Sequence, residues 1–446
     1  MRGYGWSAGC VDVWGANEQR DQVFLVDWVA KQPWSDGNVG FYGQSYVGTT
    51  AVEAAIHAPA ALKAIIAVAP VTDAYNDWHF GGVPNGENTL SPVGYQLLGA
   101  GGAFPPLGST RPESYLEYGT DLQYLAARAD NGFCDPTLMP RANDPRAIYD
   151  AFYEERNLSA SAGPVTAAVL YTQGFEDSNV KSALIPDWFN ALTSPKLGLF
   201  GHWVHQHPTR ADNEALFLLW LDQHVKGKPV GFEKLPSVRA LTNDGRERVG
   251  DAWPAATDAF TLHLDPAGGR LSDAPARGFA TILMDSARGT LPVSLATLPL
   301  AQVRLEMESA PLAAPVELAG SAVVHVEATL QHAQNAYVAA YLYETRGDER
   351  ALVTWGMFNV AHRDGHDRYV PVAPGERFRI GIPLLPTEWT FRPGAVLTLE
   401  LHGAAIDEWA LTPPTEPGAL DVHAEGSALE LPVATGATPM PVTARR

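Results

Sequence analysis

The sequence of 446 residues predicts a mixed α/β domain followed by an all-β sandwich. Two different residue patterns along the chain support this prediction. Up to about residue 236, short runs of β-branched residues alternate with longer helical patterns, as in a parallel sheet wrapped by helices. Beyond that point, Gly and Pro turns separate segments of alternating polarity at 321–330, 336–344 and 395–403. A chain of this length also exceeds one ordinary domain, so a second module is expected.

Hydrophobic periodicity places the strands and helices of the first part. Residues 18–30 place five apolar side chains on one side, which predicts a helix packed on the sheet; they are Val23, Val26, Leu25, Trp28 and Val29. A second helix is expected at 46–57. Short apolar runs that fit buried parallel strands occupy residues 38–42, 64–69, 165–171 and 196–200.

Residues 73–163 interrupt the alternation of short apolar strands and helical segments. They are rich in Gly, Pro and aromatic residues, so we interpret them as a mainly helical cap inserted between two strands of the sheet. The expected organisation is a sheet domain formed by 1–72 and 164–236, the cap at 73–163, and a β-sandwich at 237–446.

The composition excludes several classes of protein. A hydrophobic fraction of 46% with 18% charged residues is typical of a soluble globular chain. The formal net charge of -19 would repel nucleic-acid phosphates and anionic lipid, so no nucleic acid is expected as partner, and the absence of a long apolar run predicts no membrane span. Cys10 and Cys134 are the only cysteines, and no CxxC motif is present; two unpaired thiols are expected, with a single bridge between them as the alternative.

The sharpest local pattern is Gly43-Gln44-Ser45-Tyr46 with Gly48 shortly after, placed between a predicted strand and a predicted helix. A tight strand-to-helix turn holds such a serine in a strained backbone and requires small neighbours. Taken alone, Gly-x-Ser also fits an ordinary turn serine. Its position between strand and helix favours a nucleophile at Ser45, with the amides at the helix N-terminus available to an oxyanion.

A serine hydroxyl needs an imidazole to accept its proton and a carboxylate to orient that imidazole. The strand at 165–171 runs into a loop with Glu176 and Asp177, of which we favour Asp177, although it could instead cap a helix. The earlier Asp73 does not fit the expected chain order, in which serine, acid and histidine follow one another as in α/β-hydrolases. The strand at 196–200 then runs into a loop with three candidate bases: His202, His205 and His207.

Three histidines so close together could also hold a metal ion. No HExxH motif or matching carboxylate pattern accompanies them, so we expect no metal and no cofactor. Other histidines, such as His79 and His224, are interpreted as packed or solvated side chains without a role.

The segments around Ser45, Asp177 and His205 resemble those of the CocE/NonD hydrolases. This family contains Xaa-Pro dipeptidyl-peptidases, cocaine-esterase-like enzymes and α-amino-acid ester hydrolases. The resemblance covers nearly the whole chain and is most specific over residues 32–48. It implies an α/β-hydrolase sheet with a helical cap insertion, a jelly-roll-like sandwich, and catalysis by Ser45, Asp177 and His205. His205 matches the base in the family pattern Gly-Pro-Trp-x-His, but His202 replaces the Pro here, which leaves His202 as the alternative base.

The resemblance also implies an oxyanion hole formed by the backbone N–H of Tyr46 and, in cocaine-esterase-like members, by a tyrosine of an early segment. Because that segment would precede Met1, the chain is expected to be truncated at its N-terminus, with an apolar sheet edge that could pair with another copy. The compartment is left open: cytoplasmic if Met1 is the true start, or secreted if an upstream segment is missing.

The expected reaction is acyl transfer to water on a peptide or small ester. The run 177–181 resembles that of Xaa-Pro dipeptidyl-peptidases, so release of N-terminal dipeptides is the first expectation and ester hydrolysis the second. A third hypothesis is a catalytically weak or inactive binding protein left by truncation. A substrate α-amine would need acidic groups, for which the cap offers Asp77, Glu87, Glu113 and Asp121.

Overall fold

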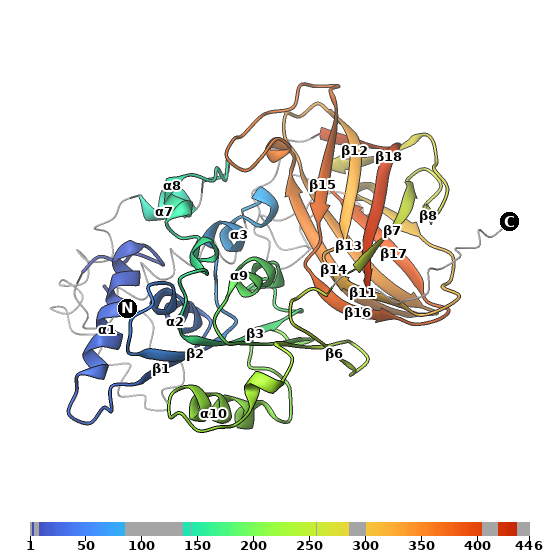
Figure 1. Ribbon diagram of the computed structural model, residues 1–446. Coiled ribbons are helices and arrows are strands. Elements are labelled where there is room, and N and C mark those ends of the chain that lie inside the picture. The colour runs from blue at the N-terminus through green and yellow to red at the C-terminus, as the bar shows by residue number, and fades with distance from the viewer. Residues whose placement is uncertain are drawn as a thin grey trace, which may run out of the picture.

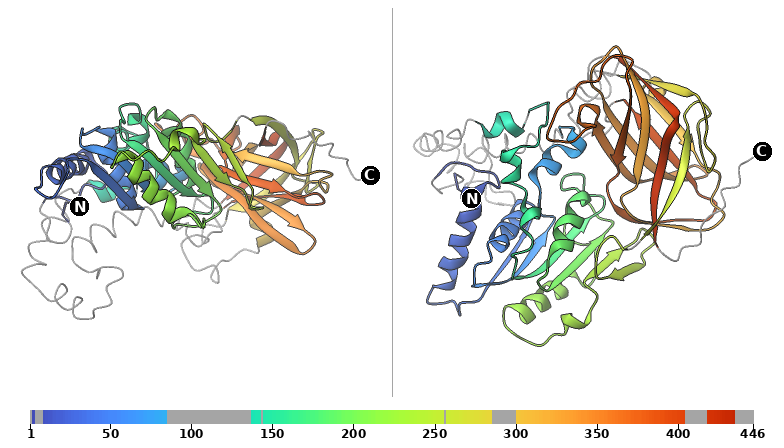
Figure 2. Two further views of the ribbon diagram at one scale, coloured as in Figure 1. Left: turned by 60° about the horizontal axis from the view of Figure 1, so that its bottom comes forward. Right: turned by 45° about the horizontal axis from the view of Figure 1, so that its top comes forward.

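The computed structural model describes residues 2–3, 9–84, 137–142, 144–255, 257–284, 300–403 and 418–434. The chain forms two bodies that lie side by side, an α/β domain and an all-β domain (Figure 1). Figure 2 shows the same two bodies from two further directions. The predicted succession of a mixed domain and an all-β domain is therefore confirmed.

Among the described residues of the α/β domain, six strands form one sheet in the order β1-β2-β3-β4-β5-β6. Strands β1 to β5 run parallel, and β6 returns antiparallel to β5. Sequential order with helical crossovers places the carboxyl ends of the parallel strands at one edge of the sheet. The strands are β1 (Val39–Gln44), β2 (Leu62–Val68), β3 (Ala168–Gly174), β4 (Lys196–Gly201), β5 (Val238–Leu241) and β6 (Glu247–Gly250).

Helices cover both faces of this sheet. On β2, Ile65 and Ala67 share a core with α2 and α9, whereas Ile66 and Val68 share another core with α10. This alternation follows from the two-residue period of a strand, and burial on both faces explains why β2 is almost entirely apolar. The helices are α1 (Ala16–Ala30), α2 (Tyr46–Ile56), α3 (Ala74–Trp78), α7 (Leu138–Ala142), α8 (Ala151–Glu154), α9 (Ile185–Ala191), α10 (Asn213–His224) and α11 (Leu300–Val303). Among the described helices, none has both the length and the apolar character that a bilayer crossing requires.

Helix α1 forms as predicted, and of the predicted apolar face Val26 is buried while Val29 packs against the same core. Leu25 and Trp28 are 46% and 48% exposed, so the prediction that these two side chains pack on the sheet is wrong. Polar side chains occupy part of the buried face instead, and Glu18 accepts a tertiary hydrogen bond from the hydroxyl of Tyr46. The buried side chains of α1 are Glu18, Gln19, Gln22 and Val26.

Strands β5 and β6 lie beyond residue 236, where the sequence placed the end of the sheet domain, yet both extend the first sheet. The first sheet therefore extends past the predicted boundary. We propose that the first domain continues to Gly250 and that the all-β domain begins with β7 at Thr257.

The described part of the predicted cap consists of short helical pieces that follow β2. Asp73 caps α3 by accepting hydrogen bonds from the backbone N–H groups of Tyr75 and Asn76. Residues 85–136, with the predicted acids Glu87, Glu113 and Asp121, lie outside the described residues. The other single-turn elements of the chain are η1 (Phe80–Gly82), η3 (Leu158–Ser161), η4 (Ser182–Leu184), η5 (Phe232–Lys234) and η7 (Val360–His362).

Cys10 is disulfide-bonded, so the expectation of two unpaired thiols is wrong. Cys134, the other cysteine of the sequence, lies outside the described residues. A disulfide forms only where two cysteines lie close together in the folded chain, and no local sequence pattern reveals that distance.

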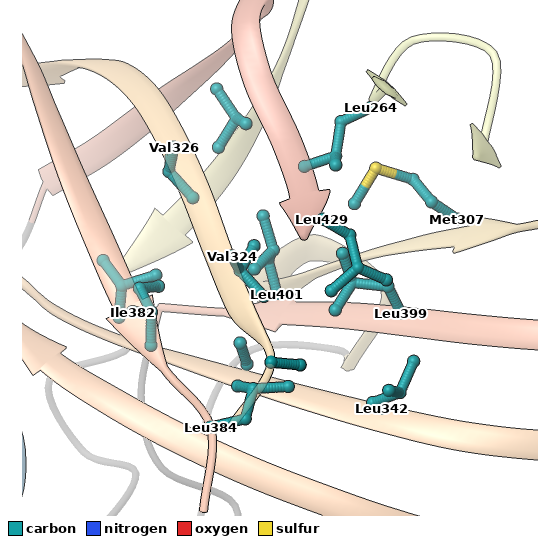
Figure 3. Packing of buried hydrophobic residues seen from close by; sticks show 14 of the residues in the cluster. Leu264, Met307, Val324, Val326, Leu342, Ile382, Leu384, Leu399, Leu401 and Leu429 are labelled. Carbon is teal, nitrogen blue, oxygen red and sulfur yellow. The ribbon is translucent and has the colours of Figure 1, made fainter. Parts of the chain in front are cut away.

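In the part of the all-β domain that the structure describes, twelve strands pack round one apolar core. Figure 3 shows part of this core, with Leu399 and Leu401 among its labelled side chains. Strand pairing is antiparallel except for one bridge between β8 and β10. The strands are β7 (Thr257–Asp265), β8 (Arg270–Ser272), β9 (Phe279–Met284), β10 (Arg304–Glu308), β11 (Val316–Gly320), β12 (Val323–Gln331), β13 (Tyr337–Arg346), β14 (Glu349–Asn359), β15 (Arg377–Pro383), β16 (Thr387–Phe391), β17 (Val396–His402) and β18 (Gly418–Ala434).

Replacing Leu399 by Ala should destabilise the all-β domain. Leu399 is fully buried between Met307 and Leu342 on the neighbouring strands, so truncation removes apolar contacts and leaves a cavity that costs about 2–5 kcal/mol. Scanning calorimetry should show a melting temperature several degrees lower for Leu399→Ala than for Leu352→Ala, whose leucine is 45% exposed. Equal melting temperatures for the two variants would contradict this packing.

Candidate active site

Ser45 stands at the turn between β1 and α2. Its backbone has φ 60° and ψ -128°, a left-handed conformation that costs a non-glycine residue free energy. The turn is held on both sides, because Ser45 N–H donates to Val68 O at 2.8 Å and Ser45 O accepts from Thr49 N–H at 2.9 Å. The side chain of Ser45 is half-buried.

Two glycines make this turn possible. A Cβ atom on Gly43 would lie 2.5 Å from the backbone of Val47, and one on Gly48 would lie 2.7 Å from Val68 O. Neither distance is tolerated by real side chains. The close approach of α2 to the sheet therefore requires the two glycines of the pattern Gly-x-Ser-Tyr-x-Gly. In this pattern Val47 stands where the commoner motif has its second glycine.

Tyr46 is the first residue of α2 and is fixed by its side chain. Its hydroxyl donates to Glu18 Oε2 at 2.6 Å, and its ring lies 5.5 Å from that of Trp14. A helix N-terminus carries partial positive charge on its free N–H groups. The backbone N–H of Tyr46 therefore belongs to a rigid, positively polarised turn beside Ser45.

Asp177 lies on the loop after β3 with its carboxylate fully enclosed. Oδ1 accepts hydrogen bonds from the backbone N–H groups of Asn179 at 3.0 Å and Val180 at 2.9 Å. Oδ2 accepts from Gln173 Nε2 at 3.0 Å and from His205 Nδ1 at 2.8 Å. An ionised carboxylate only accepts hydrogen bonds, so Nδ1 carries the proton and Nε2 is the ring nitrogen that can act as a base.

The three histidines of the loop after β4 have three different partners. His205 faces Asp177, whereas His207 Nε2 lies 2.5 Å from the hydroxyl of Tyr42 on β1. His202 turns its Nε2 to the backbone carbonyl of Glu388 in the all-β domain, at 2.7 Å. Of the two candidate bases, the structure brings His205 and not His202 to Asp177.

The competing acids have other contacts. Glu176 is 54% exposed, and its Oε1 lies 3.4 Å from His202 Nδ1. The hydrogen bond with His202 lowers the pKa of Glu176. Asp73 caps α3, as described above, so the arrangement singles out Asp177 among the acids considered.

The strand ends of Ser45 and His205 are in direct contact. Gln44, which precedes Ser45, donates from Nε2 to the backbone carbonyl of His205 at 3.4 Å. Sequence reasoning missed both Gln44 and Gln173, although glutamines near the ends of apolar strands are a visible signal of a polar site. Tyr42 was also missed, because nothing in the sequence indicates that it contacts His207, one of the three candidate bases.

Asp77 borders this arrangement. Its side chain is 3% exposed, and burial raises its pKa to about 7. The charges of Lys181, Asp177 and His205 also act on that pKa. Lys181 is fully buried and donates from Nζ to the backbone carbonyl of Asp77 at 3.1 Å.

A parallel sheet, a strained serine at a strand-to-helix turn, and an acid and a histidine on later strand ends define the architecture of an α/β-hydrolase. The order of Ser45, Asp177 and His205 along the chain is the order of that class.

Comparisons with known proteins place the chain within this class. The family model X-Pro dipeptidyl-peptidase (S15 family) matches residues 1–207, and the model X-Pro dipeptidyl-peptidase C-terminal non-catalytic domain matches residues 230–439. The chain belongs to the CocE/NonD family and is a hydrolase.

Individual relatives have low sequence identity to this chain but match most of its length. Cocaine esterase of Rhodococcus sp. is 23% identical over 451 residues, which cover 88% of this chain and 77% of the esterase. The Xaa-Pro dipeptidyl-peptidase of Lacticaseibacillus casei is 23% identical over 467 residues, covering 90% of this chain and 57% of the peptidase. A CocE/NonD family hydrolase from Staphylococcus aureus matches the fold with a TM-score of 0.77 at 18% identity, covering 97% of this chain and 79% of that one.

Glu18 should make the stability of the protein depend on pH. Burial raises its pKa from 4.5 to about 7, so between these values the folded chain holds a proton that the unfolded chain has lost, and stability falls as pH rises. Glu18→Gln removes the charge and should raise the melting temperature near pH 8 by several degrees while changing it little near pH 5.

The matched control for this measurement is Glu154→Gln, which alters an exposed glutamate on α8. If Glu18→Gln shifts the melting temperature equally at both pH values, Glu18 is not the group responsible.

Proposed function

We propose that this protein is a serine hydrolase with Ser45 as nucleophile, His205 as general base and Asp177 as the residue that orients the base. The observation that carries the proposal is the 2.8 Å hydrogen bond from His205 Nδ1 to the enclosed carboxylate of Asp177, on a loop that contacts the strand end of Ser45. Fixing the Nδ1 tautomer leaves Nε2 available to the serine hydroxyl.

The proposed reaction has two balanced steps. Ser45 Oγ attacks the substrate carbonyl while His205 Nε2 takes its proton, and His205 then returns the proton to the leaving amine or alcohol, which departs from the acyl-enzyme. Water attacks the ester on Ser45 with the same histidine as base, which releases the acid and restores the hydroxyl. The backbone N–H of Tyr46 stabilises the oxyanion in both steps.

Peptides with an N-terminal Xaa-Pro dipeptide are the proposed substrates. Two observations support them: both matching family models describe X-Pro dipeptidyl-peptidases, and residues 177–181 resemble the corresponding run of those enzymes. Such an enzyme must bind a free α-amine, and Asp77 is the candidate acid that lies among the described residues. Lys181, four positions after Asp177 in the chain, donates a hydrogen bond to the backbone carbonyl of Asp77, so Asp77 lies against the loop that carries Asp177.

Ester hydrolysis is the second candidate. It is supported by the similarity to cocaine esterase, which extends over 88% of this chain. The same serine chemistry serves both substrates, so the fold alone does not decide between them.

Replacing Ser45 by Ala should abolish turnover of an Xaa-Pro-p-nitroanilide. Asp177→Asn should lower kcat by about 10⁴-fold, because an amide in place of the carboxylate favours the wrong tautomer of His205. Release of p-nitroaniline measures both effects, with Glu154→Gln as a surface control. A Ser45→Ala variant that keeps the wild-type rate would refute the nucleophile, and hydrolysis of phenyl esters without any Xaa-Pro-p-nitroanilide turnover would refute the peptidase assignment.

Replacing Asp77 by Asn should weaken binding of substrates that carry an α-amine. Loss of the carboxylate removes an ion pair made in both ground state and transition state, so KM for Ala-Pro-p-nitroanilide should rise by about 10-fold or more with a smaller change in kcat. KM for phenyl acetate, which has no amine, should stay the same. An equal loss on both substrates would show that Asp77 does not select the amine.

A further inference from the structure

His202 connects the loop that carries His205 to the other domain. The His202 side chain is 11% exposed, and its Nε2 lies 2.7 Å from the backbone carbonyl of Glu388 on β16. Because a carbonyl only accepts, Nε2 is the donor in this bond. The imidazole ring also contacts those of Phe175 and Trp389, with centroids 5.3 Å and 5.4 Å away.

The acceptor of this bond is itself immobilised. Glu388 is fully buried, its Oε2 accepts from Arg248 Nε at 2.7 Å, and its Oε1 accepts from Trp253 Nε1 at 2.9 Å. Arg248 and Trp253 belong to the first domain or to the segment that follows its last strand. Strand β16 of the all-β domain is therefore anchored beside the β4 loop by contacts that do not involve His202.

The β4 loop is held at both ends as well as in its middle. His207 contacts Tyr42 on β1 at one end, and His202 contacts β16 at the other. Between them, Trp203 O accepts a hydrogen bond from Glu176 N–H at 3.3 Å and approaches Gly174 so closely that a Cβ there would lie 1.9 Å away. Only three positions separate His202 from His205, so the anchor at His202 limits where His205 can lie.

We propose that His202 is a positioning residue through which the all-β domain holds His205 in register with Ser45 and Asp177. This inference rests on the proposed function of His205 as base. It gives the all-β domain a role in catalysis without any contact with the reacting atoms. Displacing a catalytic group by about 1 Å can cost about 100-fold in rate even when the altered residue lies outside the chemistry.

The test compares His202→Ala with His202→Gln, in which the amide N–H can still donate to Glu388 O. His202→Ala should lower kcat for the cleaved substrate by about 10- to 100-fold with KM within about twofold, because orientation of the base matters only in the chemical step. His202→Gln should recover kcat to within about threefold of wild type. The matched control is His263→Ala, on β7 of the all-β domain, which should leave kcat unchanged.

Two outcomes would overturn the role of His202: a kcat for His202→Ala within about twofold of wild type, or a His202→Gln variant as slow as His202→Ala. If His202→Ala does not fold, His202→Gln decides alone, and a loss of more than about 10-fold contradicts the proposal. A wild-type rate in Ser45→Ala would refute the proposed function itself, whereas an inactive Ser45→Ala with a fully active His202→Ala refutes only the positioning.

Discussion

The hydrogen bond between His205 Nδ1 and Asp177 Oδ2 is the interaction on which the site depends. It fixes the tautomer of the imidazole, and a tautomer of the other kind could not take a proton from a serine. Asp177 can hold this bond because two backbone N–H groups and Gln173 satisfy the rest of its carboxylate. The same contacts compensate the desolvation of a carboxylate that is fully enclosed.

The architecture supplies this bond from elements far apart in sequence. Parallel strands β1, β3 and β4 end at one edge of the sheet, so the residues that follow them meet there. Glycines at 43 and 48 let α2 approach close enough to force Ser45 into its strained turn. The all-β domain completes the frame, since the carbonyl of Glu388 on β16 accepts a hydrogen bond from His202 on the β4 loop.

Local pattern was sufficient to place the parallel strands up to β4 and to name two loops whose Asp177 and His205 side chains meet in the structure. The burial of Leu25 and Trp28 on α1 was mispredicted, since polar side chains such as Glu18, which accepts from Tyr46 O–H, occupy part of the buried face. The partner of His202 lies 186 positions away in another domain, which no periodicity reveals. Strands β5 and β6 pair with the first sheet although they follow residue 236, and sequence does not reveal this because short alternating strands look alike in either sheet.

Covalent labelling shows directly whether His205 activates Ser45 as a nucleophile, because this measurement does not need the natural substrate. The full chain is treated with a fluorophosphonate, and the modified residue is located by peptide mass spectrometry. The account predicts one adduct, on Ser45, and a labelling rate at least about 100-fold lower in a His205→Ala variant. An unmodified Ser45 at saturating probe, or equal labelling in the two proteins, would contradict it.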